Sequence, residues 1–342
     1  MILPAMQRRI IRIGTFPKGL WNAVLATGSY VLRSPAIWGK PVNATIEPTN
    51  LCNQQCPACE TGMGALKRPR GTMPFKHYTT IIDKIAPHTN TLLLYYMGEP
   101  FLHKDIYLMI AYAKARRIFV KICTNGLLVD SAKLFDSGLD EIQFQLGGVS
   151  QKTHEIYRKG GQLSKVLDAV RATVRERDAR RRNGKKIVSR IYLGLIVMRH
   201  NEQEIPAFLQ LANEIGVDDY RLEAPCVRSI AQARDLIPRD WRFQLYDKHG
   251  LENGVLRHRN FRAHQCRWMN YSLTITWEGD VIPCCRDVQA RYVMGNLIRE
   301  DMRSLWNGEK FKAFRRDILK GAQPLAMCQV CDGLTFPSLE NV

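Results

Sequence analysis

Between residues 42 and 225 the chain repeats one pattern: a short apolar run, then a segment with apolar residues at helical spacing. Such runs, bounded by turn residues, are typical of buried strands, and the segments between them predict amphipathic helices. Strands that alternate with helices indicate an α/β fold with a parallel sheet, which right-handed crossovers would curl into a partial (β/α)6 barrel. The predicted strands are 42–48, 91–100, 119–126, 141–148, 190–201 and 218–225. Helices are predicted at 77–86, 106–117, 165–181 and 204–216.

The pattern changes after about residue 235. Residues 271–285 predict a short hairpin that turns at Glu278-Gly279-Asp280, and 302–319 predicts one helix. This part carries five cysteines and is too small for a large core, so it needs a staple such as a metal site. The basic run at 180–186 is expected to be a solvated loop. We therefore divide the chain into an N-terminal arm at 1–41, a barrel at 42–235 and a C-terminal extension at 236–342.

Composition narrows the class of protein. The 342 residues are 45% hydrophobic and 24% charged, which is ordinary for a globular protein. No run of about eighteen apolar residues predicts a transmembrane helix, and no signal peptide is expected at the N-terminus. A reducing cytoplasm is therefore expected, and there ten cysteines favour metal binding or chemistry over disulfides.

The net charge of +18 is concentrated partly at the N-terminus, where the first acidic residue is Glu47. A basic and amphipathic arm suggests peripheral contact with anionic lipid at the inner membrane face, or with another polyanion. The alternative is a solvated leader helix that packs on the barrel. Nucleic acid is not an expected partner, because no RNA-recognition motif or C₂H₂ finger is present. The cations of the arm are Arg8, Arg9, Arg12, Lys18, Arg33 and Lys40, interleaved with Ile10, Ile11, Ile13, Phe16, Leu20 and Trp21.

Three thiols, Cys52, Cys56 and Cys59, lie just after the first predicted strand. Sites in this type of fold gather at the carboxyl ends of the strands. A structural zinc ion takes four tetrahedral ligands, whereas three cysteines in a tight loop suit three corners of a cubane iron–sulfur cluster with one iron left open. A zinc site closed by a distant ligand is the alternative.

Cys-x₃-Cys-x₂-Cys after the first strand resembles the signature of the radical S-adenosylmethionine superfamily. Three more matches follow in the order that the family shows: Met97-Gly98-Glu99-Pro100, "TNG" at 124–126 and "YRKGG" at 157–161. The resemblance covers roughly residues 42 to 226. It implies an enzyme that reductively cleaves S-adenosylmethionine and abstracts a hydrogen atom from its substrate, supplied with electrons by a donor such as flavodoxin or ferredoxin.

The resemblance also implies roles for individual residues. Cys52, Cys56 and Cys59 would hold a [4Fe–4S] cluster, and the cofactor-binding residues would be Gly98, Glu99, Asn125, Gln145 and Arg158. Glu99 would accept hydrogen bonds from the amino group of S-adenosylmethionine, and Arg158 would bind its carboxylate. The chain departs from the family at Ala58, where an aromatic residue usually contacts adenine, and at Gln145, where a serine is usual. Taken alone, Glu99 would be read as a surface carboxylate and Arg158 as a solvated cation.

A second cysteine set, C-x₁₇-C-x₄₃-C-x₂-C, comprises Cys266, Cys284, Cys328 and Cys331. Four thiolates suit either zinc or an iron–sulfur cluster. The segment resembles the SPASM extension in its shorter "twitch" form, which implies one auxiliary [4Fe–4S] cluster. Its spacing resembles that of the butirosin aminocyclitol dehydrogenase.

Three further cysteines have no predicted ligand role. Cys123 is read as a small buried hydrophobe. Cys226 and Cys285 are the candidate catalytic residues, as thiols that could return a hydrogen atom to a substrate radical. The alternative for both is a packing role.

Together these features predict oxidation or epimerisation of a carbinol C–H bond in a sugar or cyclitol. The alternative is maturation of a peptide or modification of a lipid-linked substrate, so that the partner would be a small molecule or a carrier-linked one. A protein of another class, a non-catalytic iron–sulfur or zinc-binding interaction protein, is the third hypothesis.

Overall fold

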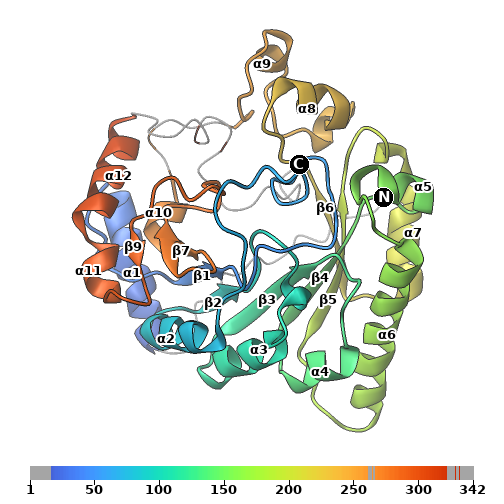
Figure 1. The fold of residues 1–342 in the computed structure, drawn as a ribbon, viewed down its shortest axis with the longest axis horizontal. Coiled ribbons are helices and arrows are strands. Elements are labelled where there is room, and N and C mark those ends of the chain that lie inside the picture. Colours follow the sequence, from blue (N-terminus) through green and yellow to red (C-terminus); the bar gives the residue numbers. More distant parts are fainter. Residues whose placement is uncertain (1–16, 261–263, 265, 322–327, 329–330, 332–342) are drawn as a thin grey trace.

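The computed structural model describes residues 17–260, 264, 266–321, 328 and 331. In this part of the chain the strands form one nine-stranded sheet in the order β6-β5-β4-β3-β2-β1-β7-β8-β9 (Figure 1). The six predicted strands all form and pair in parallel with their neighbours. They are β1 (Asn43–Ile46), β2 (Thr91–Leu93), β3 (Phe119–Thr124), β4 (Glu141–Leu146), β5 (Arg190–Ile196) and β6 (Asp219–Glu223). The predicted α/β partial barrel is thus confirmed.

Helices connect these strands and cover one face of the sheet, as Figure 1 shows along its lower and right sides. They are α2 (Phe75–Ile85), α3 (Ile106–Ala115), α4 (Ser131–Asp136), α5 (Gln151–Tyr157), α6 (Leu163–Arg182) and α7 (Ile205–Ile215), with short 3₁₀ turns η1 (Pro100–Leu102) and η2 (Glu202–Glu204). Side chains alternate across a strand, so the apolar residues of β4, such as Phe144, pack under α6, while Gln143 and Gln145 face the barrel interior.

The C-terminal extension continues the same sheet. β7 (Ser272–Ile275) pairs in parallel with β1, and β8 (Asp280–Ile282) and β9 (Gly295–Asn296) follow in antiparallel pairing. The predicted hairpin is confirmed, and Gly279 supplies the positive φ of +84° that its turn requires. α8 (Ile230–Leu236) ends the barrel segment. The extension also contains η3 (Trp241–Phe243), α9 (Lys248–Glu252), α10 (Trp268–Tyr271), α11 (Met302–Trp306) and α12 (Glu309–Lys320).

Two local predictions are wrong. The helix predicted over 302–319 is broken between α11 and α12, because the Asn307 side chain turns aside to clamp the backbone of Ile37, accepting from its N–H and donating to its carbonyl at 2.9 Å each. The basic run at 180–186 is not wholly a loop, because α6 extends through Arg182. Ion pairs from Arg180 to Asp136 and Glu176, at 2.7 Å each, stabilise that last turn.

The first described helix, α1 (Pro17–Val31), lies beside the extension in Figure 1. Its inner face buries Asn22, Ala26 and Ser29. The Asn22 side chain bonds both the N–H and the carbonyl of Lys40, at 2.6 and 3.0 Å, which holds the following loop against the helix. Residues 1–16 of the predicted basic arm, with Arg8, Arg9 and Arg12, lie outside the described residues. Within the described chain, none of the helices has the length and apolar character needed to span a membrane.

Candidate functional site

Four sequence motifs that were predicted to act together do lie together in space. They follow β1, β2, β3 and β4, and the carboxyl ends of parallel strands share one edge of the sheet. Each of the other three motifs bonds directly to the loop that carries Cys52, Cys56 and Cys59. The contacts run from the Glu99 N–H to the Leu51 carbonyl (2.8 Å), from Asn125 Nδ2 to Asn53 Oδ1 (2.7 Å) and from the Gln55 N–H to the Lys159 carbonyl (3.0 Å).

Gly98 allows the turn after β2 to approach this loop closely. Its φ is +89°, and a Cβ at this position would lie 2.6 Å from the Leu51 carbonyl oxygen and 2.7 Å from that of Thr49. Both the backbone conformation and the space therefore require glycine. The close approach places Glu99 next to the cysteine loop.

The Glu99 carboxylate is buried and held in place by the chain. Oε1 accepts from Thr124 Oγ1 at 2.7 Å and from the Phe101 N–H at 3.2 Å, and Oε2 accepts from the Asn125 N–H at 2.8 Å. Burial raises the pKa of Glu99, although these hydrogen bonds oppose that shift. A carboxylate offers about four acceptor positions, so one stays available on Oε2 for the amino group predicted to bind here.

Arg158 ends α5 and turns toward the cysteine loop, with Nη1 3.8 Å from the Cys56 Sγ. Its Nε is buried and makes no hydrogen bond to the described residues. A buried guanidinium N–H without a partner is costly, and a carboxylate would satisfy it. This orphaned donor supports the predicted role of Arg158.

The three thiols differ little in environment. Cys56 is buried, while Cys52 and Cys59 are partly buried. Burial raises the pKa of Cys52 to about 11 and also raises the pKa of Cys59. The raised pKa values favour the protonated form of Cys52 and Cys59 until a metal displaces the proton.

The barrel wall contains one acidic residue that sequence reasoning missed. Glu223, in β6, accepts hydrogen bonds from Gln143 Nε2 at 3.0 Å and from Gln145 Nε2 at 2.5 Å. Gly194 on the intervening strand leaves room for both amides, since a Cβ there would lie 2.8 Å from each. The buried Gln145 Oε1 has no partner among the described residues, so it is available as a hydrogen-bond acceptor in its predicted cofactor-binding role. The signal that could have identified Glu223 was its place at the end of the sixth strand.

The second cysteine set gathers at the C-terminal extension. Cys266 and Cys328 pack against a small core of Met269, Phe314 and Ile318. Burial raises the pKa of Cys266 to about 12, and the nearby Cys331 and Cys328 raise it further. Burial likewise raises the pKa of Cys284, helped by Cys285, Cys266 and Cys331. Of the four predicted ligands, Cys266 and Cys328 thus share one small core.

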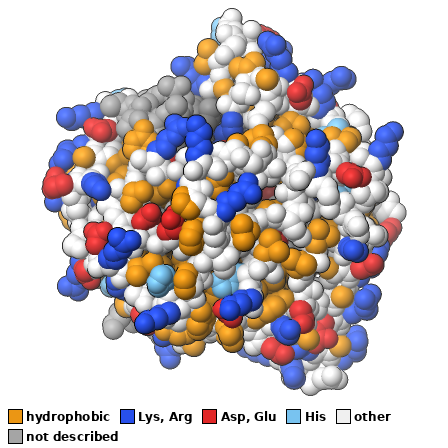
Figure 2. Space-filling model, viewed as in Figure 1, with side chains coloured by type: hydrophobic (Ala, Val, Ile, Leu, Met, Phe, Trp, Pro, Cys, Tyr) orange, Lys and Arg blue, Asp and Glu red, His pale blue; other side chains and the backbone are white. Residues whose placement is uncertain are grey.

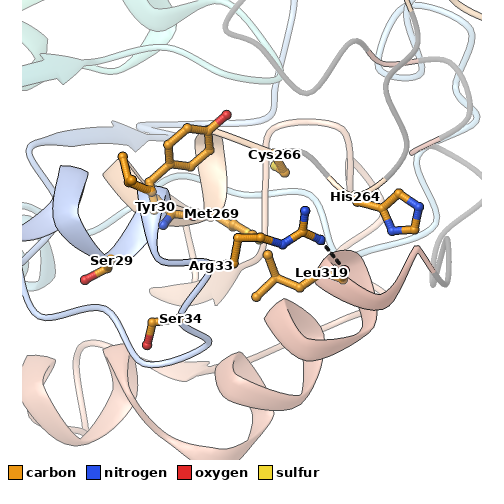
Figure 3. A pocket seen from close by; sticks show the side chains of 10 residues that line it. Ser29, Tyr30, Arg33, Ser34, His264, Cys266, Met269 and Leu319 are labelled. Carbon is orange, nitrogen blue, oxygen red and sulfur yellow. Dashed lines mark hydrogen bonds between the residues drawn. The ribbon is translucent and has the colours of Figure 1, made fainter.

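A pocket of about 200 Å³ opens beside Cys266 (Figure 3). It is lined by the end of α1 and the loop after it, by Met269, and by Leu319 of α12. Arg33 extends across it and donates from Nη2 to the Leu319 carbonyl at 2.7 Å. The pocket lies next to the auxiliary cysteines and does not include the residues predicted to bind S-adenosylmethionine.

Cys226, one of the two candidate catalytic thiols, lies between two arginines that the sequence did not indicate. Arg286 donates from Nη1 to its Sγ, and Arg228 donates from Nη1 at 3.0 Å. Arg228 also bonds Glu60, the neighbour of Cys59, from Nε to Oε1 at 2.6 Å. Burial opposes ionisation of the thiol, but Arg286 and Arg228 outweigh it and lower the pKa of Cys226. For Cys285, burial raises the pKa to about 11.

The face that carries these groups is rich in cations. Figure 2 shows Lys and Arg side chains over much of it, several of them near the centre, where Figure 1 places the loop after β1. Among the described residues, no three Cys, His, Asp or Glu side chains form a group that could hold a metal ion. The ligand and cofactor roles of individual residues therefore stay predictions, which the orphaned atoms of Arg158 and Gln145 support.

Two family models match the chain. Residues 46–212 match the radical SAM superfamily, and residues 266–332 match SPASM, described as an iron–sulfur cluster-binding domain. The radical SAM match covers just under half of the chain, and the SPASM match adds a further part of it. Together the two matches show that the chain belongs to the radical SAM superfamily, as its motifs predicted. Its C-terminal extension is a SPASM domain. Members of this superfamily use a [4Fe–4S] cluster with S-adenosylmethionine, and SPASM domains add auxiliary clusters.

Curated relatives are distant. A PqqA peptide cyclase of Granulibacter bethesdensis is 28% identical over 180 residues, which are 52% of this chain and 45% of that protein. The mycofactocin maturase MftC of Mycobacterium ulcerans is 27% identical over 185 residues, again 52% and 45%. A PqqA peptide cyclase of Xanthomonas campestris is 24% identical over 297 residues, 80% of this chain and 76% of that protein. The chain thus spans about half the length of the first two relatives.

Solved structures share the fold at low identity. SuiB of Streptococcus suis, solved bound to the precursor peptide SuiA, has a TM-score of 0.63 at 14% identity and covers 93% of this chain and 76% of its own. BtrN, solved with AdoMet and 2-DOIA, has a TM-score of 0.52 at 18% identity, with 85% and 92% covered. The enzyme anSMEcpe with bound AdoMet has a TM-score of 0.59 at 14% identity, with 85% and 88% covered. At such identities the likeness establishes the fold alone.

Proposed function

We propose that this radical S-adenosylmethionine enzyme modifies a peptide by breaking one of its C–H bonds. The observation that carries the proposal is that the curated relatives are a peptide cyclase and a maturase. In this chain, the four motifs of the predicted site also contact one another. The sequence alone favoured a sugar or cyclitol and placed a peptide second. The relatives reverse that order.

The chain's own residues would divide the work as follows. Cys52, Cys56 and Cys59 would hold the cluster, Glu99 would bind the amino group of S-adenosylmethionine, and Arg158 would bind its carboxylate. When bound, the cofactor and the reduced cluster supply a radical that abstracts a hydrogen atom from the substrate. The protein would position the reacting C–H bond and exclude water from the site. The buried position of Glu99 is consistent with a site from which water is excluded.

Two arginine side chains near the cysteine loop suit a peptide with carboxylates. Arg228 and Arg286 lie beside the cysteine loop, and within the described chain their anionic partners are Glu60 and the Cys226 thiol. A guanidinium binds a carboxylate through two parallel hydrogen bonds. We therefore expect the modified peptide to carry an acidic residue or its C-terminal carboxylate near the reacting carbon.

A second candidate is oxidation of a sugar or cyclitol, as the sequence first suggested. It is favoured by the fold likeness to BtrN, which extends over 92% of that protein, and by the spacing of the auxiliary cysteines. Modification of a lipid-linked substrate, which the sequence analysis grouped with peptide maturation, is a variant of the first candidate. A non-catalytic iron–sulfur or zinc protein is the alternative of another class.

The test is anaerobic turnover of the reconstituted protein with dithionite, S-adenosylmethionine and peptides encoded beside its gene. Formation of 5′-deoxyadenosine should rise when the right peptide is added, and the peptide should lose two hydrogen atoms in mass or gain one deuterium in D₂O. The variant with Cys52, Cys56 and Cys59 all changed to Ala is the control and should form neither product. Stimulation by cyclitols but not by peptides would support the second candidate, and no cleavage of S-adenosylmethionine would favour the non-catalytic one.

A further inference from the structure

The large hydrophobic side chains that are most exposed are concentrated on α1 and the loop that follows it. Eight large hydrophobic side chains of the described residues are at least half exposed, and five of them fall within residues 21–38. Isolated exposed hydrophobic residues are common, but a contiguous patch marks a contact surface. The five are Trp21 (64% exposed), Val24 (50%), Val31 (68%), Leu32 (66%) and Trp38 (52%), and we call them the α1 patch.

Helical geometry makes these residues one surface. At 3.6 residues per turn, positions 21, 24, 28, 31 and 32 fall on one side of α1, opposite the buried Asn22, Ala26 and Ser29. Trp38, in the loop after α1, lies against the same side of the helix. A Cβ on Gly28 would lie 3.4 Å from the Trp38 ring.

The loop holds Trp38 in place. Gly39 passes so close to the helix that a Cβ there would lie 2.7 Å from the Asn22 carbonyl oxygen, and the Trp38 N–H donates to Ser29 Oγ at 2.8 Å. Both indoles are thus displayed from a fixed framework rather than from a loose segment.

The charge around the patch selects its partner. Residues 17–46 contain no acidic residue, the exposed Arg33 lies directly after Leu32, and the whole chain carries a net charge of +18. Two copies of this chain meeting at the patch would bring like charges together, whereas an anionic surface would be attracted. Tryptophan is also the side chain that favours the boundary between lipid headgroups and acyl chains.

We propose that the α1 patch docks the protein on the surface of an anionic lipid bilayer, with Trp21 and Trp38 inserted into the interface. The contact is peripheral, because α1 lies along the protein and is buried on its other face. The role is separate from catalysis, because the patch shares no residue with the four motifs of the site.

The experiment uses the full chain and vesicles made of equal parts phosphatidylglycerol and phosphatidylcholine. Wild-type protein should sediment with these vesicles, with an affinity that falls steeply as salt is added. Trp21→Ser with Trp38→Ser should weaken binding by about tenfold or more, since each removes a large apolar group. Vesicles with brominated acyl chains should quench the fluorescence of the wild type but not of this variant.

Trp241→Ser is the matched control, because Trp241 is 69% exposed but lies in η3 on the C-terminal extension. It should leave binding and quenching unchanged. Val31→Ser with Leu32→Ser is a second test of the patch, and thermal unfolding checks that both double variants stay folded. The proposal is overturned if wild-type protein does not bind, if the double variants bind as the wild type does, if Trp241→Ser weakens binding equally, or if the wild type is a dimer that the patch variants dissociate.

Discussion

At the scale of single residues, the contacts of Cys226 change the role expected of it. A thiol returns a hydrogen atom only while it carries one, but the flanking Arg228 and Arg286 stabilise the thiolate against the opposing effect of burial. The folded protein should therefore hold Cys226 ionised at a lower pH than an ordinary cysteine, whose pKa is about 8.5. This favours Cys226 as an anionic partner of the arginines over the hydrogen donor suggested from the sequence.

The pH dependence of alkylation tests this expectation. The rate at which iodoacetamide modifies Cys226, followed by peptide mass spectrometry, should reach its half-maximum at a lower pH than the rate for an ordinary cysteine. Arg228→Gln should raise the pKa and move the profile to higher pH, slowing the reaction at neutral pH roughly tenfold for each pKa unit. Arg242→Gln removes an exposed arginine elsewhere and should change nothing. A wild-type profile with its midpoint at or above the ordinary cysteine pKa of about 8.5 would contradict the expectation.

The residues that could be predicted from the sequence are those whose role is set locally. Gly98 and Glu99 belong to a four-residue turn motif that can be recognised in the sequence. Three cysteines within eight residues are equally easy to recognise as candidate metal ligands. The end of the sixth strand marks Glu223 as a candidate, but its contacts, like those of Arg286, could not be predicted, because their partners Gln145 and Cys226 are 78 and 60 positions away along the chain. Such contacts depend on the register of the strands, which the hydrophobic pattern does not specify.

At the scale of elements, the buried pair of Glu47 and Arg68 joins three segments. Glu47 follows β1, Arg68 follows the cysteine loop, and the two form a double hydrogen bond with neither side chain more than 5% exposed. Arg68 Nε also donates to the Val288 carbonyl at 2.8 Å, and the Trp277 N–H donates to Glu47 Oε2 at 3.2 Å. The pair therefore ties the cluster loop to the C-terminal extension.

Breaking one half of this pair should destabilise the protein strongly. Glu47→Gln leaves a buried guanidinium without its counter-charge, so we expect the free energy of unfolding to fall by about 3–5 kcal/mol in denaturant titrations. Glu47→Gln with Arg68→Gln should recover part of the loss, since no unpaired charge is then buried. Asp168→Asn, which breaks the exposed pair with Arg171, should cost less than about 1 kcal/mol. Equal effects of the two single variants would contradict the bridging role.

Helices and strands could be predicted where the periodicity of apolar residues alone determines them. They could not be predicted where a contact with a distant part of the chain determines them. The six parallel strands and the hairpin follow from apolar runs and turn residues. The break between α11 and α12 does not, because it depends on Asn307 leaving the helix to bond Ile37. The parallel pairing of β7 with β1 was equally hidden, since it joins residues more than two hundred positions apart.

At the scale of the whole molecule, that pairing makes one sheet support two cysteine sites. β1 leads directly into the loop with Cys52, Cys56 and Cys59, and its neighbour β7 belongs to the hairpin that ends at Cys284. The two sites are thus built on adjacent strands of one rigid framework. Such placement would suit electron transfer between a substrate and an auxiliary cluster. The number of clusters can be tested by measuring the iron content of the protein.

We expect about eight irons per chain after anaerobic reconstitution, from two four-iron clusters, one on each cysteine set. Changing Cys52, Cys56 and Cys59 to Ala should halve the iron and abolish formation of 5′-deoxyadenosine. Changing Cys266, Cys284, Cys328 and Cys331 to Ala should also halve the iron, because each set is predicted to hold its own cluster. Cys123→Ala is the control and should keep all the iron, since Cys123 lies inside β3 and not in either set. One zinc with four irons in the wild type would make the C-terminal site a zinc site, and substantially more than eight irons would require ligands beyond these seven cysteines.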